Sequence, residues 1–238
     1  VLRCAAIEWP DAYCKAIDID CSGLSPQEIA QQLMMEIVSG GPEIDVGLAK
    51  GGNRLTTTLV AHRPDVSSQG LNADDVVVVS GGARGVTAAS IIALAKSSKA
   101  KFLLFGRTVV QADPCPQAQS RAEINRALLQ LDKCTPKELR KRANRVLACR
   151  EIQNTLSRME SAGATVLYRS IDVTDQQVLA ACLDEVRQEW GAISAVIHGA
   201  GVLADKAIKD KSVDDFEWVF RIKIAGMQAL LESTQADP

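Results

Sequence analysis

The stretch Ser80-Gly-Gly-Ala-Arg-Gly-Val-Thr87 joins a β-branched run, Val76–Val79, to an Ala-rich segment that extends from Ala88 to about Lys99. A β-branched run without polar alternation is typical of a parallel strand covered on both faces. A glycine-rich turn between such a strand and a helix exposes backbone N–H groups at the positive end of the helix dipole, where they bind phosphate. The stretch therefore predicts a dinucleotide-binding turn, with a purely structural strand–helix turn as the alternative.

The glycines of this turn have different roles. Gly81 permits the tight turn, and Gly85 lets the backbone approach a pyrophosphate. Thr87 replaces the third glycine of the common pattern, so the match is incomplete. We expect five turn residues to contact the cofactor: Gly81, Gly82, Arg84, Gly85 and Val86.

The residue after the second strand indicates which cofactor binds. An NAD enzyme usually carries Asp or Glu about 20 residues beyond the turn, to bind the ribose 2′-hydroxyl. Here the second strand, Phe102–Phe105, is followed by Gly106 and Arg107, and Arg84 lies within the turn. Two guanidinium groups bind a 2′-phosphate through charge-assisted hydrogen bonds. We predict NADPH rather than NADH; the alternative is that both arginines are simply exposed to solvent.

Two later loops fit the same site, because ligands bind at the carboxyl ends of parallel strands. Asp172 and Val173 follow a predicted strand, Thr165–Ile171, and are expected at the adenine. Capping of the predicted helix Gln176–Trp190 is the other interpretation of this Asp/Thr loop, and both can hold. The loop after the fourth predicted strand, Ile193–His198, is expected at the ribose and nicotinamide through His198, Gly199, Ala200 and Gly201. No acid–base role is assigned to His198.

The alternation of strands and helices predicts an α/β fold with a Rossmann-like, doubly wound parallel sheet, incomplete at its C-terminal side. We assign residues 71–238 to this part, with a helical insertion at about 108–161 and a long final helix, Val213–Thr234. Residues 1–70 are expected to form a separate small subdomain, followed by a linker at Pro64–Asn72. Its predicted elements are a strand at Lys15–Asp20, a helix at Ser25–Val38, and strands near Ile44–Leu48 and Leu55–Ala61.

Composition excludes several function classes. The 238 residues carry a net charge of −2, which provides no basic field for nucleic acid. No apolar run approaches the roughly 20 residues that span a bilayer. The seven cysteines are odd in number, scattered and without a CxxC pair, so neither a disulfide framework nor a metal site is expected. We predict a cytoplasmic protein with reduced thiols.

Four segments together resemble the ketoreductase domains of modular fatty acid and polyketide synthases, and among these most of all the polyunsaturated fatty acid synthases. They are Ser80-Gly-Gly-Ala-Arg-Gly-Val-Thr-Ala, Leu104-Phe-Gly-Arg107, Asp172-Val-Thr-Asp175 and Ile197-His-Gly-Ala-Gly-Val-Leu-Ala-Asp-Lys206. Thr135-Pro-Lys-Glu-Leu and Cys149-Arg-Glu-Ile, in the insertion, are also similar to that group. Residues 1–70 resemble the small, truncated Rossmann-like structural subdomain that precedes the catalytic one.

The resemblance implies NADPH-dependent reduction of a 3-ketoacyl group, carried on the phosphopantetheine arm of an acyl carrier protein, to a 3-hydroxyacyl group. A tyrosine donates the proton, a serine holds the carbonyl, and a lysine lowers the pKa of the tyrosine. Lys223-Ile-Ala-Gly226 matches the Lys-x-x-Gly pattern of that lysine, against the alternative of a surface lysine. The resemblance also implies as partners the carrier protein and the other synthase domains, with a homodimer formed through the parent synthase.

The catalytic serine and tyrosine are expected to lie outside these residues. Neither Tyr13 nor Tyr168 begins a Tyr-x-x-x-Asn or Tyr-x-x-x-Lys pattern. We therefore expect a fragment that binds cofactor weakly and is inactive alone. A non-catalytic scaffold remains as an alternative, and a sugar-nucleotide epimerase is disfavoured by Arg107. For the basic segment Lys137–Arg145, a solvated helix face is preferred over a docking site for an acidic carrier protein.

Overall fold

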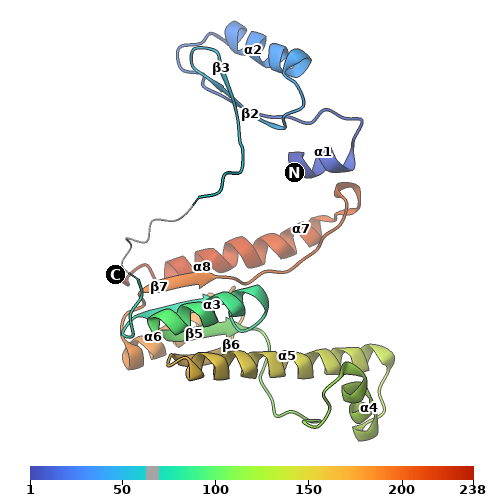
Figure 1. The fold of residues 1–238 in the computed structure, drawn as a ribbon, viewed down its shortest axis with the longest axis vertical. Coiled ribbons are helices and arrows are strands. Elements are labelled where there is room, and N and C mark those ends of the chain that lie inside the picture. The colour runs from blue at the N-terminus through green and yellow to red at the C-terminus, as the bar shows by residue number, and fades with distance from the viewer. Residues whose placement is uncertain (63–69) are drawn as a thin grey trace. The chain divides into compact units, whose positions relative to one another are not determined.

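The computed structural model describes residues 1–62 and 70–238, which form two compact units (Figure 1). One unit comprises Val1–Ser68 and Asp205–Ser212, and the other comprises Gln69–Ala204 and Val213–Pro238. The predicted linker, Pro64–Asn72, lies mostly outside the described residues.

The first unit is a small three-stranded sheet with a crossover helix. Strand β1 (Ala16–Ile19) is parallel to β2 (Asp45–Ala49), which is antiparallel to β3 (Asn53–Thr56). Helix α2 (Pro26–Ser39) connects β1 to β2, and a short helix, α1 (Leu2–Glu8), precedes them.

The predicted elements of the first unit are present, with two differences. The strand expected at Leu55–Ala61 is wrong in its bounds, because pairing with β2 ends at the Val46–Thr56 pair and leaves the later residues without a partner strand. Helix α1 was not expected, since no side chain caps its start. The start of α2 follows its sequence signal: Ser25 and Glu28 form a reciprocal capping box.

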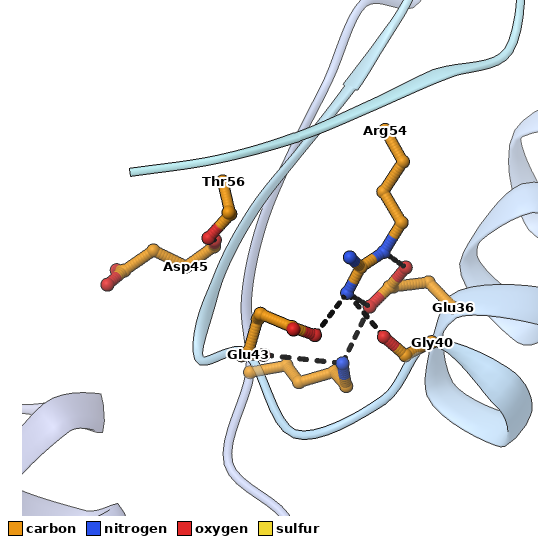
Figure 2. Close-up of polar contacts among 7 residues, drawn as sticks. Glu36, Gly40, Glu43, Asp45, Arg54 and Thr56 are labelled. Carbon is orange, nitrogen blue, oxygen red and sulfur yellow. Dashed lines mark hydrogen bonds and ion pairs between the residues drawn. The ribbon is translucent and has the colours of Figure 1, made fainter. Parts of the chain in front are cut away.

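An ion-pair cluster around the buried Glu36 holds α2 to the rest of the first unit (Figure 2). The Glu36 carboxylate, 4% exposed, accepts from Lys15 Nζ at 2.6 Å and from Arg54 Nε at 2.7 Å. Arg54 also donates to the Glu43 carboxylate at 2.9 Å and to the Gly40 carbonyl. Hydrogen bonds from Arg54 and Lys15 lower the pKa of Glu36 to about 2, so this carboxylate is ionised in the folded protein.

The second unit is the predicted doubly wound parallel sheet, and the Rossmann-like fold class is confirmed. Its strands lie in the order β6-β5-β4-β7 and are all parallel. Their bounds are Val76–Ser80 for β4, Lys101–Gly106 for β5, Thr165–Ser170 for β6 and Ala195–His198 for β7. All five residues of β4 are buried, as expected for a β-branched run covered on both faces.

Helices cover both faces of this sheet. Helices α3 (Gly85–Ser98) and α5 (Pro136–Ser161) pack on one face, and α6 (Gln176–Trp190) and α8 (Gly226–Ser233) pack on the other. Alternate residues of β4 point to opposite faces, so Val77 and Val79 join the first core and Val76 and Val78 the second.

The segment predicted as an insertion contains two parts. Helix α4 (Arg121–Leu131) packs with the first half of α5 around Ile124, Leu128 and Val146. The second half of α5 lies on the sheet through Ile152 and Met159, and it also serves as the crossover from β5 to β6.

The helix expected at Val213–Thr234 is not uniform. It consists of α7 (Val213–Phe220), a π-helical turn (Arg221–Ala225) and α8. Gly226 follows the π-helical turn and packs tightly, since a Cβ there would lie 2.9 Å from Val173 Cγ1 and 3.1 Å from His198 Cε1. Sequence periodicity does not reveal such a turn, which often marks a functional position.

Candidate functional site

The carboxyl ends of the parallel strands open into a cleft of about 390 Å³. Nine of the residues predicted to bind cofactor line it: Gly81, Arg84, Gly85, Arg107, Asp172, Val173, Gly199, Ala200 and Gly201. The cleft thus brings together four loops that are far apart in the sequence, each at the end of a strand.

Two of these loops touch through glycine. Gly81 has φ +69°, and a Cβ there would lie 2.7 Å from the backbone nitrogen of Ala200. A Cβ at Gly199 would lie 2.5 Å from Cγ2 of Thr87, the residue that replaces the third glycine of the common pattern. Gly199 has no side chain, and it therefore leaves room for the Thr87 side chain in the turn.

Gly82 and Val86 do not line the cleft, although both were predicted to contact the cofactor. Gly82 is buried, and a Cβ there would lie 2.6 Å from Val79 Cγ1, so it serves the packing of α3 on β4. The Val86 side chain is 85% exposed and points away from the core.

The two arginines differ in their contacts. Arg107 is exposed and makes no hydrogen bond or ion pair within the described part of the chain. Arg84 donates from Nε to Glu151 Oε2 at 2.7 Å. The other oxygen of Glu151 accepts from the backbone N–H of Gly85 at 2.9 Å. Glu151 was not predicted as a site residue, because α5 shows no local motif that directs it to a turn 66 positions away.

Asp172 is held in the cleft by its own loop. Its Oδ1 accepts from the Thr174 backbone N–H at 3.0 Å and from the Thr174 hydroxyl at 2.8 Å. Burial alone would raise the pKa of Asp172, but these bonds, with Arg107 and Arg221 nearby, lower it overall. The capping interpretation applies to Asp175 instead, whose carboxylate accepts from Val178 N–H at the start of α6.

His198 is a structural bridge, and its ring does not line the cleft. Nδ1 lies 2.6 Å from Ser80 Oγ, and Nε2 lies 3.1 Å from the Ile222 carbonyl. Because a carbonyl only accepts, Nε2 carries the proton and Nδ1 accepts from the serine hydroxyl. Burial lowers the pKa of His198, so the ring is neutral and ties β4 and β7 to the π-helical turn.

Lys223 lies within the π-helical turn and reaches the loop after β7. A Cβ at Gly201 would lie 2.7 Å from Lys223 Cε and 2.9 Å from its Nζ. Tyr168 is at the opposite edge of the sheet, where its hydroxyl donates to the Thr108 carbonyl at 2.8 Å. Tyr13 belongs to the other unit.

The sequence profile of the KR domain family matches residues 75–238, most of the chain. The chain belongs to the KR domain family. It is a ketoreductase domain of the kind found in polyketide and polyunsaturated fatty acid synthases, as the sequence resemblance predicted.

KR domain relatives occur within much longer proteins. The chain is 29% identical over 245 residues to a polyunsaturated fatty acid synthase protein of Thraustochytrium sp., and the match covers 95% of this chain and 9% of that protein. It is 34% identical over 82 residues to polyketide synthase PksM of Bacillus subtilis, covering 34% of this chain and 2% of that protein. The chain thus spans less than a tenth of these curated relatives.

Solved KR domain structures share the fold. A ketoreductase domain from the bacillaene assembly line matches with a TM-score of 0.61 and 22% identity, over 100% of this chain and 47% of that one. An A1-type ketoreductase matches with a TM-score of 0.66 and 22% identity, over 98% of this chain and 41% of that one.

In the described residues, no helix is both long and apolar enough to cross a membrane, and no group of His, Cys, Asp and Glu is arranged to hold a metal ion.

Proposed function

We propose that the cleft binds NADPH and that the domain reduces 3-ketoacyl groups on the phosphopantetheine arm of an acyl carrier protein to 3-hydroxyacyl groups. The observation that carries the cofactor choice is that two arginines, Arg84 and Arg107, line the cleft. No carboxylate follows β5 to bind a ribose 2′-hydroxyl, and a 2′-phosphate needs cations there.

The residues present fit a dinucleotide. Gly85 has a positive φ and open space where a Cβ would lie, which leaves the backbone accessible where α3 begins. The Gly85 N–H already binds a carboxylate oxygen, so it is aimed to donate to an anion. Gly199–Gly201 would lie along the nicotinamide ribose, and Asp172 near the adenine. When bound, NADPH supplies the hydride.

We assign Lys223 the role of stabilising the anion that forms when a proton donor gives up its proton, since a nearby ammonium lowers the pKa of a phenol. Neither tyrosine of this chain accompanies Lys223, so we expect the chain alone to bind cofactor without turnover. We further infer that residues 1–70 form a structural subdomain, residues 71–238 the cofactor-binding part, and that the domain works in the cytoplasm beside other domains of a dimeric synthase.

The test is a calorimetric titration of NADPH and of NADH into the wild-type chain and the Arg107→Ala variant. Loss of one charge-assisted contact is expected to weaken NADPH binding by about 10- to 100-fold and to leave NADH binding almost unchanged. Arg126→Ala, which removes an exposed arginine of α4 outside the cleft, is the control. Absence of binding by the wild-type chain would contradict the proposal and favour a non-catalytic scaffold.

A further inference from the structure

A carboxylate of the protein already occupies the anion-binding corner of the cleft. Glu151 accepts from the Gly85 N–H at 2.9 Å and from Arg84 Nε at 2.7 Å. These are an N–H at the start of α3 and one of the two guanidinium groups expected to bind cofactor. The Glu151 side chain satisfies both donors in the way that a phosphate oxygen would.

The charge of Glu151 is retained at neutral pH. Burial would raise the pKa of Glu151, but the hydrogen bonds from Arg84 and Gly85 and the charge of Arg84 lower it overall. A phosphate that approaches Arg84 therefore meets a full negative charge within hydrogen-bonding distance of the same guanidinium group. Two anions compete for one cation, and their mutual repulsion adds to the cost.

The helix that carries Glu151 is held by its packing on the sheet, whereas the Glu151 side chain is partly exposed. Ile152 and Met159 of α5 are buried in the core beneath the sheet, and the Thr155 hydroxyl donates to the Glu151 carbonyl. The Glu151 side chain itself is 41% exposed, and that of Arg84 is 50% exposed. Glu151 can therefore leave the corner only by rotating its side chain toward solvent.

We propose that Glu151 is an internal competitor of the cofactor 2′-phosphate for Arg84, because its carboxylate already binds Nε of that guanidinium group. Glu151 thereby limits how strongly the cleft prefers NADPH over NADH. This inference rests on the proposed function, because it concerns the phosphate of the same cofactor. Glu151 is then a specificity-determining residue that weakens NADPH binding. The alternative role is a positioning residue that orients Arg84 to bind the phosphate.

Calorimetric titration of NADPH and NADH into wild type and Glu151→Gln distinguishes these roles. The variant keeps the size of the side chain and removes its charge. We expect NADPH to bind about tenfold more tightly to the variant, because the charge that opposes the 2′-phosphate is removed. NADH should gain less, because it shares with NADPH only the pyrophosphate expected near Gly85. Glu151→Ala should shift affinity in the same direction. Glu160→Gln, an exposed position on the same helix, should behave as wild type.

The outcomes separate the two proposals. Unchanged or weaker NADPH binding by Glu151→Gln, beside measurable binding by wild type, would overturn the competitor role and leave the proposed function intact. An equal gain for NADPH and NADH would also overturn it, because the effect would not involve the 2′-phosphate. No NADPH binding by either protein would contradict the proposed function and with it this inference.

Discussion

Gly81 and Gly85 both have positive φ in the turn after β4, but their surroundings differ. A Cβ at Gly81 would lie 2.7 Å from backbone atoms of Ala200, whereas a Cβ at Gly85 would meet nothing within 4 Å. Glycine is therefore needed at position 81 for two reasons: the positive φ of the backbone there, and the close contact between two loops of the cleft. The second glycine is required by conformation, and it lines the cleft.

Substitution of these glycines separates the two requirements. Gly85→Ala adds only left-handed strain, so we expect it to lower the free energy of unfolding by about 1–2 kcal/mol. Gly81→Ala adds a clash with backbone that has to move, so its cost should be larger by at least about 1 kcal/mol. Urea unfolding followed by circular dichroism measures both values. Equal destabilisation by the two variants would show that the Gly81–Ala200 contact does not matter.

Some residues of the site could be predicted from the sequence, and others could not. The glycine turn, Arg107 and the loop after β7 carry local signals, because chain geometry restricts which residues fit there. Glu151 carries none, since its place at Arg84 results from the packing of α5 on the sheet. His198 was predicted at the cofactor, and only the fold reveals that both of its ring nitrogens are already bonded elsewhere.

Elements with a strong local pattern were predicted closely. Helix α6 has the predicted bounds, because its hydrophobic period and its capping Asp175 agree. Elements decided by tertiary contacts were not. Strand β3 stops where its partner β2 begins, and the π-helical turn before α8 accompanies the packing of Gly226 on Val173. Neither feature leaves a periodic signal in the sequence.

The Glu36 cluster between α2 and β3 makes the stability of the first unit depend on pH. Glu36 has its pKa lowered from 4.5 to about 2 in the folded state. Its contribution is therefore complete above pH 4.5 and is lost as the pH falls toward 2. Loss of a buried, hydrogen-bonded charge costs roughly 2–3 kcal/mol, so Glu36→Gln should destabilise the protein at pH 7.

Thermal unfolding of wild type and Glu36→Gln at pH 7 and pH 2.5 tests this contribution. The difference in melting temperature should be large at pH 7 and much smaller at pH 2.5, because Glu36 is then protonated in the unfolded state, which cancels most of what its carboxylate contributes in the folded state. Asp18→Asn, at an exposed position of β1, provides the control and should have little effect at either pH. A difference that stays constant between the two pH values would contradict the assignment.

In the whole molecule, the proposed cofactor cleft and the Glu36 ion-pair cluster belong to different units. Every residue that lines the proposed cofactor cleft belongs to the second unit, whereas the Glu36 cluster belongs to the first. Cofactor binding should therefore stabilise the second unit, by about 2.7 kcal/mol at a free concentration of 100 times Kd.

Hydrogen–deuterium exchange of the chain with and without saturating NADPH tests most directly whether the cleft is the cofactor site. Bound NADPH should slow exchange in peptides that contain residues 80–87, 105–108, 171–174 and 199–202, with no change in residues 1–62. Protection that is absent from 80–87 and 199–202, or that falls on the first unit, would contradict the assignment of the cleft as the cofactor site.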